Sequence, residues 1–235
     1  MPRNGESVRT ARAERRAAAE LWGADDTVLR LARWSAECDV LGPGRRAVLW
    51  VQGCPFRCDE CVVPELLPFA GGDVRSVAEV VDFVLDAPDL DGVTLSGGEP
   101  FSQAAALIRV IDGVADSRPG LSVMSYTGHT LGWLQRHGSS AQRGLLDRLD
   151  ILVDGPYVPA RHTDLRWRGS DNQRVHLLTP RVADLATTLS DRGAWLEFDV
   201  DDDGAVTWSG IPPLGFRSIF EEAMAESGIT LRVTD

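Results

Sequence analysis

The stretch that decides the fold is residues 47–61, which read AVLWVQGCPFRCDEC. Its first five residues are all apolar, and such a run is typical of a strand buried on both faces of a parallel sheet. Cys54, Cys58 and Cys61 follow within eight residues, in the spacing C-x3-C-x2-C. Three cysteines this close together do not suit a disulfide framework in a chain of 235 residues, so we interpret them as metal ligands.

Two kinds of metal centre fit this cysteine loop (residues 52–61). A [4Fe–4S] cluster usually takes four thiolates, so three thiolates leave one iron open to bind a substrate directly. The alternative is a zinc ion held by the cysteines and a distant histidine. The candidate histidines are His129, His137, His162 and His176. Cys38 stands apart, and we interpret it as a small buried hydrophobic residue.

A second loop favours the open cluster. The sequence SGGEP, residues 96–100, follows an apolar strand at 92–95, and α/β folds bind their ligands at the carboxyl ends of strands. Two glycines remove the side chains there, so that backbone carbonyls and Glu99 can approach a ligand, and exposed carbonyls suit an ammonium group. A Gly-Gly turn alone is usually only a turn. Three cysteines one βα unit upstream make the combination specific.

Strand and helix patterns alternate on both sides of these loops. A capping box at Ser76 and Glu79 opens the first helix, and Ser102 is expected to cap the second. This alternation predicts a parallel sheet buried on both faces, finished by an antiparallel hairpin around the turn at 201–204. The expected strands are 28–34, 47–51, 92–95, 121–126, 150–153, 195–200, 205–208 and 230–233. The expected helices are 76–87, 102–119, 130–137, 142–149, 182–191 and 215–227.

Composition excludes several classes of function. All 24 positively charged residues are arginine, so a Schiff-base lysine, a pyridoxal-phosphate anchor and a P-loop lysine are ruled out. The net charge of −11 argues against a general nucleic-acid binder and favours a basic partner surface. Neither a long apolar run nor a signal-peptide pattern occurs, so we expect a cytoplasmic protein that binds no membrane.

Taken together, the two loops resemble those of the radical S-adenosylmethionine (SAM) superfamily. Over residues 29–178 the chain is similar to the small glycyl-radical-enzyme activases, particularly the anaerobic ribonucleoside-triphosphate reductase-activating proteins. Four further stretches carry this likeness: GPGRR at 42–46, YTG at 126–128, LVDGPY at 152–157 and WRGSDNQR at 167–174.

The resemblance implies an α/β fold, a partial (β/α) barrel with a [4Fe–4S] cluster and SAM at the carboxyl ends of its strands. Cys54, Cys58 and Cys61 would hold the cluster, whose open iron would chelate the amino and carboxylate groups of SAM. The other cofactor-binding residues that it implies are Ser96, Gly97, Gly98, Glu99, Tyr126, Asp154, Asn172 and Gln173. No catalytic residue is expected beyond the ligands of the cluster and of SAM.

The implied activity is that of a radical SAM oxidoreductase. Reductive cleavage of SAM would give a 5′-deoxyadenosyl radical that abstracts a hydrogen from a glycine of a partner glycyl-radical enzyme, such as anaerobic ribonucleotide reductase. A flavodoxin- or ferredoxin-type protein would supply the electron. We expect the partner to deliver a loop near Tyr157, Trp167, Arg168 and Asn172.

Two other functions stay open on the sequence. One is a radical SAM enzyme that acts on a small molecule or peptide, for example a carboxydeazaguanine synthase, and the other is a non-catalytic iron–sulfur or zinc protein. We expect three parts in the chain: a polar N-terminal extension (1–26), the partial barrel (27–200) and a C-terminal α+β extension that completes the same domain (201–235).

Overall fold

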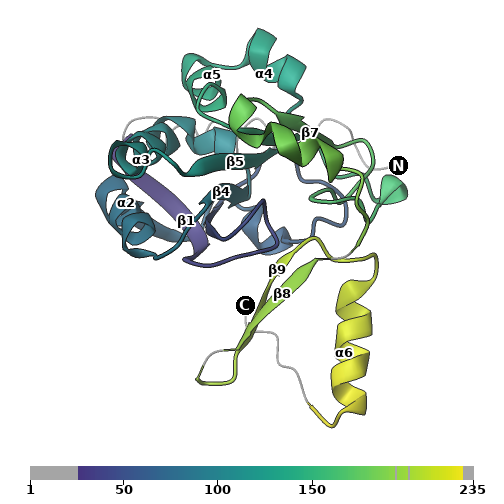
Figure 1. Cartoon of the computed structure of the whole chain (residues 1–235). Coiled ribbons are helices and arrows are strands. Elements are labelled where there is room, and N and C mark those ends of the chain that lie inside the picture. Colours follow the sequence, from purple (N-terminus) through teal and green to yellow (C-terminus); the bar gives the residue numbers. More distant parts are fainter. Residues whose placement is uncertain (1–25, 194, 201, 230–235) are drawn as a thin grey trace, which may run out of the picture.

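A seven-stranded sheet organises the protein, whose computed structural model describes residues 26–193, 195–200 and 202–229 (Figure 1). The strand order is β3-β1-β2-β4-β5-β6-β7. The strands are β1 (Val28–Ser35), β2 (Arg46–Val51), β3 (Asp73–Ser76), β4 (Gly92–Gly97), β5 (Ser122–Thr127), β6 (Ile151–Asp154) and β7 (Arg174–Leu177).

The centre of the sheet is parallel and its edges are antiparallel. Strands β2, β4, β5 and β6 run in one direction, whereas β1, β3 and β7 oppose their neighbours. This confirms the predicted α/β class with a parallel sheet, while the partial barrel stays a prediction. The sequence patterns missed β3 and β7, because each has only four residues and no apolar run.

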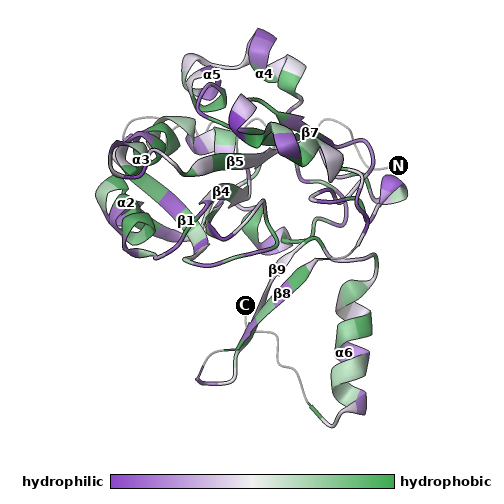
Figure 2. Cartoon of the chain, in the orientation of Figure 1, coloured by the Kyte–Doolittle hydropathy of each residue, from purple (hydrophilic) through white to green (hydrophobic). Residues whose placement is uncertain are grey.

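Helices cover one face of this sheet. They are α2 (Val77–Asp86), α3 (Ala104–Ser117), α4 (Leu131–His137) and α5 (Ser140–Leu146). Their apolar residues join Leu49, Leu95 and Leu152 in one core cluster, and Figure 2 shows apolar colouring along α2, α3 and the strands beneath them.

Two helix starts test the capping predictions. The capping box is confirmed, since the Ser76 side chain accepts from the Glu79 N–H and the Glu79 carboxylate accepts from the Ser76 N–H. The predicted cap at Ser102 is wrong. A 3-10 turn, η2 (Pro100–Gln103), precedes α3, and the Glu99 carboxylate caps that turn at the Phe101 N–H.

Loops cover the opposite face of the sheet. Val48 and Trp50 of β2 pack there with Cys38, Leu41 and Leu66, and the prediction that Cys38 is buried is confirmed. Farther along this face, Met124, Ile151 and Val153 pack against Trp167 and Val182. Short 3-10 turns lie in these covering segments: η1 (Pro64–Leu66), η3 (Pro159–Arg161) and η4 (Pro180–Thr187). The last replaces the helix expected at 182–191.

A buried arginine fastens the amino ends of three strands. The guanidinium of Arg46 is completely buried and donates to Thr94 Oγ1, Ser122 Oγ and three backbone carbonyls, at 2.6–3.0 Å. These bonds use all five N–H groups of the guanidinium, which is the condition for burying such a charge. Burial still lowers the pKa of Arg46 to about 10.

Beyond the sheet, the chain forms an arm (residues 196–226) of β8 (Leu196–Val200), β9 (Val206–Gly210) and α6 (Phe216–Glu226). Among the described strands, β8 and β9 pair only with each other, and Figure 1 shows them with α6 projecting from the body of the protein. The prediction that 195–200 continues the parallel sheet and that the hairpin finishes it is therefore wrong. Apolar and acidic residues alternate along β8, so its two faces differ in character, and both are exposed towards the tip of the hairpin.

Some predictions fall outside the described residues. They are most of the N-terminal extension (1–26) and the strand at 230–233. The division into three parts stays a prediction. Within the described ranges, no helix has both the length and the hydropathy needed to cross a bilayer.

Candidate functional site

The cysteine loop and the Gly-Gly-Glu loop (residues 97–99) lie at the same edge of the sheet. β2 and β4 are parallel neighbours in which Val51 pairs with Gly97, so the residues that follow these two strands emerge side by side. Thr127 ends β5 and Asp154 ends β6 at this edge, where they pair with each other. The carboxyl ends of four parallel strands therefore frame the candidate site, as the sequence predicted for its ligands.

The start of the cysteine loop is fixed to the segment that follows the cysteines. The N–H groups of Gly53 and Cys54 donate to the carbonyls of Leu66 and Leu67, at 2.9 and 3.0 Å. The Gln52 side chain is buried and donates to the carbonyls of Glu65 and Pro68. The start of the loop is thus tied to residues 65–68 by backbone and side-chain hydrogen bonds.

Backbone N–H groups near each of the three thiols favour its thiolate form. They belong to Phe56 and Arg57 for Cys54, to Tyr157 and Cys58 itself for Cys58, and to Val63 for Cys61. Desolvation by burial raises the pKa of all three thiols, that of Cys54 to about 12. A bound metal replaces these thiol protons, and N–H groups directed at the sulfurs then stabilise the thiolates.

Three thiolates on one loop are a donor set that fits a [4Fe–4S] cluster, in which each thiolate binds a different iron. The loop also holds Arg57 and Glu60 at positive φ, 50° and 53°, a conformation that non-glycine residues adopt chiefly where the surrounding structure imposes it.

Two glycines clamp the second loop onto the first. The Gly98 N–H donates to the Val51 carbonyl (2.7 Å) and the Glu99 N–H donates to the Gly53 carbonyl (2.9 Å). A Cβ at Gly97, whose φ is +93°, would lie 2.5 Å from the Val51 nitrogen, and one at Gly98 would lie 2.2 Å from the Gly53 oxygen. The structure shows that Gly97 makes room for the end of β2 and Gly98 for the cysteine loop, while the predicted approach of a ligand to these glycines stays a prediction.

The Glu99 carboxylate links this clamp to the next strand. It is buried and accepts from the Phe101 N–H, the Thr127 hydroxyl and the Gly128 N–H, each at 2.9 Å. Burial raises the pKa of Glu99 to about 7 against the effect of these three donors. Its expected contact with the SAM ammonium stays a prediction, whereas its hydrogen bond with Thr127 at the end of β5 is observed.

The other expected cofactor contacts hold loops around the site. Asp154 accepts from the Leu131 N–H (2.6 Å) and lies 3.1 Å from His176 Nε2, so it fixes the start of α4. Asn172 donates to the Pro156 carbonyl, and Gln173 bridges the carbonyl of Gly155 and the N–H groups of Gly169 and Ser170.

Two of the expected residues lie in the sheet itself. Ser96 is half-buried at the end of β4. Tyr126 on β5 packs against both core clusters of the loop-covered face, and its buried hydroxyl has no hydrogen-bond partner among the described residues. The expected contact of that hydroxyl with a ligand is not tested by this observation. The binding roles of all these residues stay predictions.

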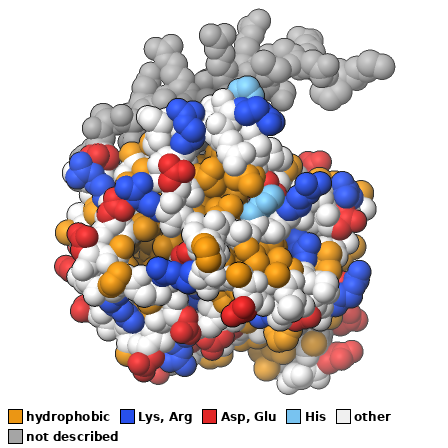
Figure 3. All heavy atoms as spheres, turned by 45° about the horizontal axis from the view of Figure 1, so that its top comes forward, with side chains coloured by type: hydrophobic (Ala, Val, Ile, Leu, Met, Phe, Trp, Pro, Cys, Tyr) orange, Lys and Arg blue, Asp and Glu red, His pale blue; other side chains and the backbone are white. Residues whose placement is uncertain are grey.

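An aromatic stack that the sequence analysis missed runs outward from the cysteine loop. Phe56 contacts His129 edge to face, and His129 stacks on Trp133 with ring centroids 4.2 Å apart. Burial lowers the pKa of His129 to about 4, so its ring is neutral at pH 7. Figure 3, in which the top of Figure 1 comes forward, shows hydrophobic side chains gathered in the middle of this face with histidine and arginine beside them. Gly128 lies against this stack, because a Cβ there would overlap the Phe56 ring. A lone glycine in the sequence does not by itself predict such a contact.

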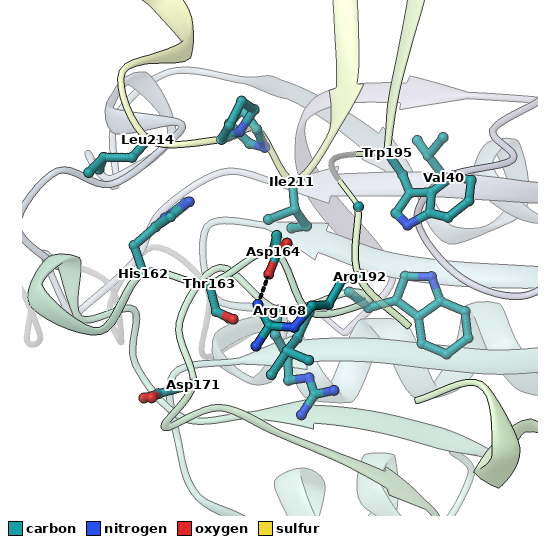
Figure 4. Close-up of a pocket in the computed structure, with 15 residues that line it drawn as sticks. Val40, His162, Thr163, Asp164, Arg168, Asp171, Arg192, Trp195, Ile211 and Leu214 are labelled. Carbon is teal, nitrogen blue, oxygen red and sulfur yellow. Dashed lines mark hydrogen bonds and ion pairs between the residues drawn. The ribbon is translucent and has the colours of Figure 1, made fainter. Parts of the chain in front are cut away.

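A cavity of about 570 Å³ lies between the arm and the loop that follows β6 (Figure 4). Its described lining includes none of the three cysteines. Trp167 and Arg168 line it, but Trp167 is only 4% exposed and packs in the core against β5 and β6, so its expected role in facing a partner is corrected. Arg168 turns inward as well, and its guanidinium donates to the Leu189 carbonyl.

Comparison with known proteins identifies the family. Residues 40–176 match the family model of a 4Fe-4S single cluster domain. An anaerobic ribonucleoside-triphosphate reductase-activating protein of Vibrio cholerae is 33% identical over 148 residues, which are 60% of this chain and 92% of the relative. A pyruvate formate-lyase-activating enzyme of Listeria monocytogenes is 38% identical over 72 residues, covering 28% of this chain and 29% of the relative.

Among solved structures, QueE from Escherichia coli matches with a TM-score of 0.33 and 16% identity, over 48% of this chain and 57% of that one. A score this low does not establish a shared fold. The family model, in contrast, covers residues 40–176, which include the parallel strands of the sheet and both loops of the candidate site. The chain therefore belongs to the family of anaerobic ribonucleoside-triphosphate reductase-activating proteins, radical SAM proteins whose cofactors are a [4Fe–4S] cluster and S-adenosylmethionine.

Proposed function

We propose that this protein is a radical SAM oxidoreductase that places a radical on a glycine of a partner glycyl-radical enzyme. The observation that carries the proposal is the clamp between the cysteine loop and the Gly-Gly-Glu loop at the carboxyl ends of β2 and β4. Membership of the activating-protein family supports it independently.

When bound, the cluster and SAM would supply the radical chemistry: with one electron from a flavodoxin- or ferredoxin-type donor, SAM would yield methionine and a 5′-deoxyadenosyl radical that would take a hydrogen atom from the glycine. In this proposal Cys54, Cys58 and Cys61 hold the cluster. Their backbone N–H donors stabilise the thiolates, and the rigid strand ends keep the three sulfurs in place.

The Gly-Gly-Glu loop presents backbone groups and a buried carboxylate beside the cysteine loop. The clamp sets the distance between the two loops, so a ligand that contacts both is positioned by backbone rather than by mobile side chains. Tyr126, Asp154, Asn172 and Gln173 surround this edge, and in the proposal they complete the SAM site directly or through the loops they hold.

The test is an anaerobic assay of the reconstituted protein with SAM, dithionite and the cognate anaerobic ribonucleoside-triphosphate reductase. We expect 5′-deoxyadenosine by chromatography and a glycyl radical on the reductase by EPR, and neither product with Cys54→Ala. Cleavage of SAM that leaves no radical on the reductase would support action on a small molecule or peptide instead. A protein that holds zinc and leaves SAM intact would contradict the enzyme altogether.

A further inference from the structure

The arm lies outside the part of the chain that the family explains. The family model ends at residue 176, whereas the arm begins at 196. The Vibrio cholerae relative is matched over 92% of its length by only 60% of this chain, so this chain is the longer of the two. The arm is therefore a structural element outside the region that the family model matches.

The arm is attached to the sheet in a fixed direction. The guanidinium of Arg33 on β1 donates to the Trp208 carbonyl (3.2 Å) and to Ser209 Oγ (2.9 Å) and stacks on the Trp50 ring. The Asp39 N–H donates to the Glu197 carboxylate. Within the arm, the rings of Phe198, Trp208, Phe216 and Phe220 pack on one another with centroids 5.2–6.2 Å apart.

The tip of the hairpin exposes an apolar strip. Val200 pairs with Val206, and Phe198 pairs with Trp208, so all four side chains lie on one face of the two strands. The α6 helix packs on Phe198 and Trp208, yet Val200 is 63% exposed and Val206 41% exposed. Figure 2 shows apolar colouring in β8, β9 and α6 although these elements project from the body. An exposed apolar patch with a polar rim is typical of a protein interaction site.

The charge of the arm restricts the occupant. Residues 196–226 contain eight carboxylates and one arginine, so this short segment holds seven of the eleven net negative charges of the chain. Phosphate backbones and anionic lipid surfaces would repel it. A second copy of the arm would repel it too, because it carries the same charge. A protein surface with an apolar groove and a basic rim complements both features.

The root of the arm connects this surface to the candidate site. Ile211 and Leu214 of the arm line the cavity opposite His162 and Arg168 of the loop that follows β6 (Figure 4). In that loop the Tyr157 hydroxyl contacts His162 Nδ1 (3.2 Å), and the Tyr157 N–H lies near the Cys58 thiol and favours its thiolate form. A protein that binds the tip of the arm and also reaches its root therefore meets the loop that lies beside Cys58.

We propose that the arm is a docking element that binds a basic, apolar groove on the glycyl-radical enzyme and holds that enzyme beside the cysteine loop. The inference rests on the proposed function for the identity of the partner. It adds that binding is carried by residues 196–226, away from the residues of the chemistry.

The experiment measures anaerobic binding of the cluster-loaded full chain to the cognate anaerobic ribonucleoside-triphosphate reductase. One variant removes the apolar tip (Val200→Ser with Val206→Ser), and another removes charge (Asp199→Asn, Asp202→Asn and Asp203→Asn). Matched controls lie on the body: Val74→Ser, which is 56% exposed, and Asp82→Asn with Asp86→Asn and Asp116→Asn, all exposed.

We expect the tip variant to weaken binding by about tenfold, because it removes the apolar side-chain area that the interface would bury. The charge variant should weaken binding at low salt and flatten its salt dependence. Dithionite-driven cleavage of SAM without the reductase should be unchanged in both variants, and the controls should bind as the wild type does.

Wild-type affinity in both arm variants would overturn the inference and leave the proposed function standing. Loss of self-association in the tip variant with unchanged reductase binding would also overturn it, since the arm would then be a self-interface. A wild type that cleaves SAM but does not bind the reductase would contradict the proposed function and the inference with it.

Discussion

The cysteine edge of the sheet and the arm are built in opposite ways. At the cysteine edge, backbone meets backbone: Gly98 lies directly on Gly53, and the strands behind it are buried on both faces. In the arm, two strands and one helix share a small aromatic cluster and expose both valines and carboxylates. One chain can therefore combine a tightly packed edge that positions cofactors with a separate, charged element suited to recognition.

The largest effect is expected at the cysteine edge. Replacing any one of Cys54, Cys58 or Cys61 with alanine should abolish stable cluster assembly and SAM cleavage, because a site that already lacks one thiolate cannot lose another. Iron and sulfide content after anaerobic reconstitution measures the first, and 5′-deoxyadenosine the second. Cys38→Ala is the control and should retain both. A dispensable cysteine among the three, with loss of the cluster in Cys38→Ala, would refute the ligand assignment.

Two tryptophans line the same cavity, Trp167 from the loop that follows β6 and Trp195 from the residue before β8, and we expect their replacement to have different effects. Trp167→Ala should lower the free energy of unfolding by about 3–5 kcal/mol, because its ring is buried against the sheet. Trp195→Ala, at the root of the arm, should lower it by less than about 1 kcal/mol because Trp195 is 50% exposed. Urea denaturation followed by circular dichroism gives both values. Equal losses would mean that the arm is as much a part of the core as the sheet.

Local signals made much of the fold predictable. The Ser76 capping box, the apolar run of β2 and the cysteine spacing are each contained in a few consecutive residues, and the structure has the first two as expected. The hairpin was predicted as a hairpin for the same reason. The separation of this hairpin from the main sheet was not predicted, because it depends on which strands pair with β8, and the local sequence does not show that.

Contacts between distant residues account for what the sequence did not show. Glu99 and Thr127 are 28 residues apart, and no sequence pattern around either residue predicts their hydrogen bond. Trp167 looked like a partner contact because arginines flank it, but tertiary packing places its ring under β5 and β6. Gly98 was predicted to face a ligand, which stays a prediction, and the neighbour that requires a glycine there is Gly53 of the other loop.

The third prediction concerns the joint between the two regions and is smaller. Arg33→Met removes the two hydrogen bonds that tie β9 to β1, which should lower local stability in the arm by about 1–2 kcal/mol. Hydrogen exchange should therefore rise in β8 and β9 while β2 and β4 keep their protection. Arg75→Met is the matched control, since Arg75 also stacks on a tryptophan, Trp34, but does not contact the arm among the described residues. Uniformly faster exchange across the sheet would show that the two regions are not separable.

The two loops of the site form one clamped unit, and Gly98→Ala probes that unit at its closest contact. The measurement is iron content together with the change that SAM induces in the EPR spectrum of the reduced cluster, with Gly120→Ala as control because a Cβ there meets nothing within 4 Å. A Cβ at Gly98 would push on Gly53, which directly precedes Cys54, and so would displace a ligand of the cluster. We therefore expect the iron content and the SAM response to fall together. Normal iron content with loss of the SAM response alone would contradict the clamp and return the glycine to a purely ligand-facing role.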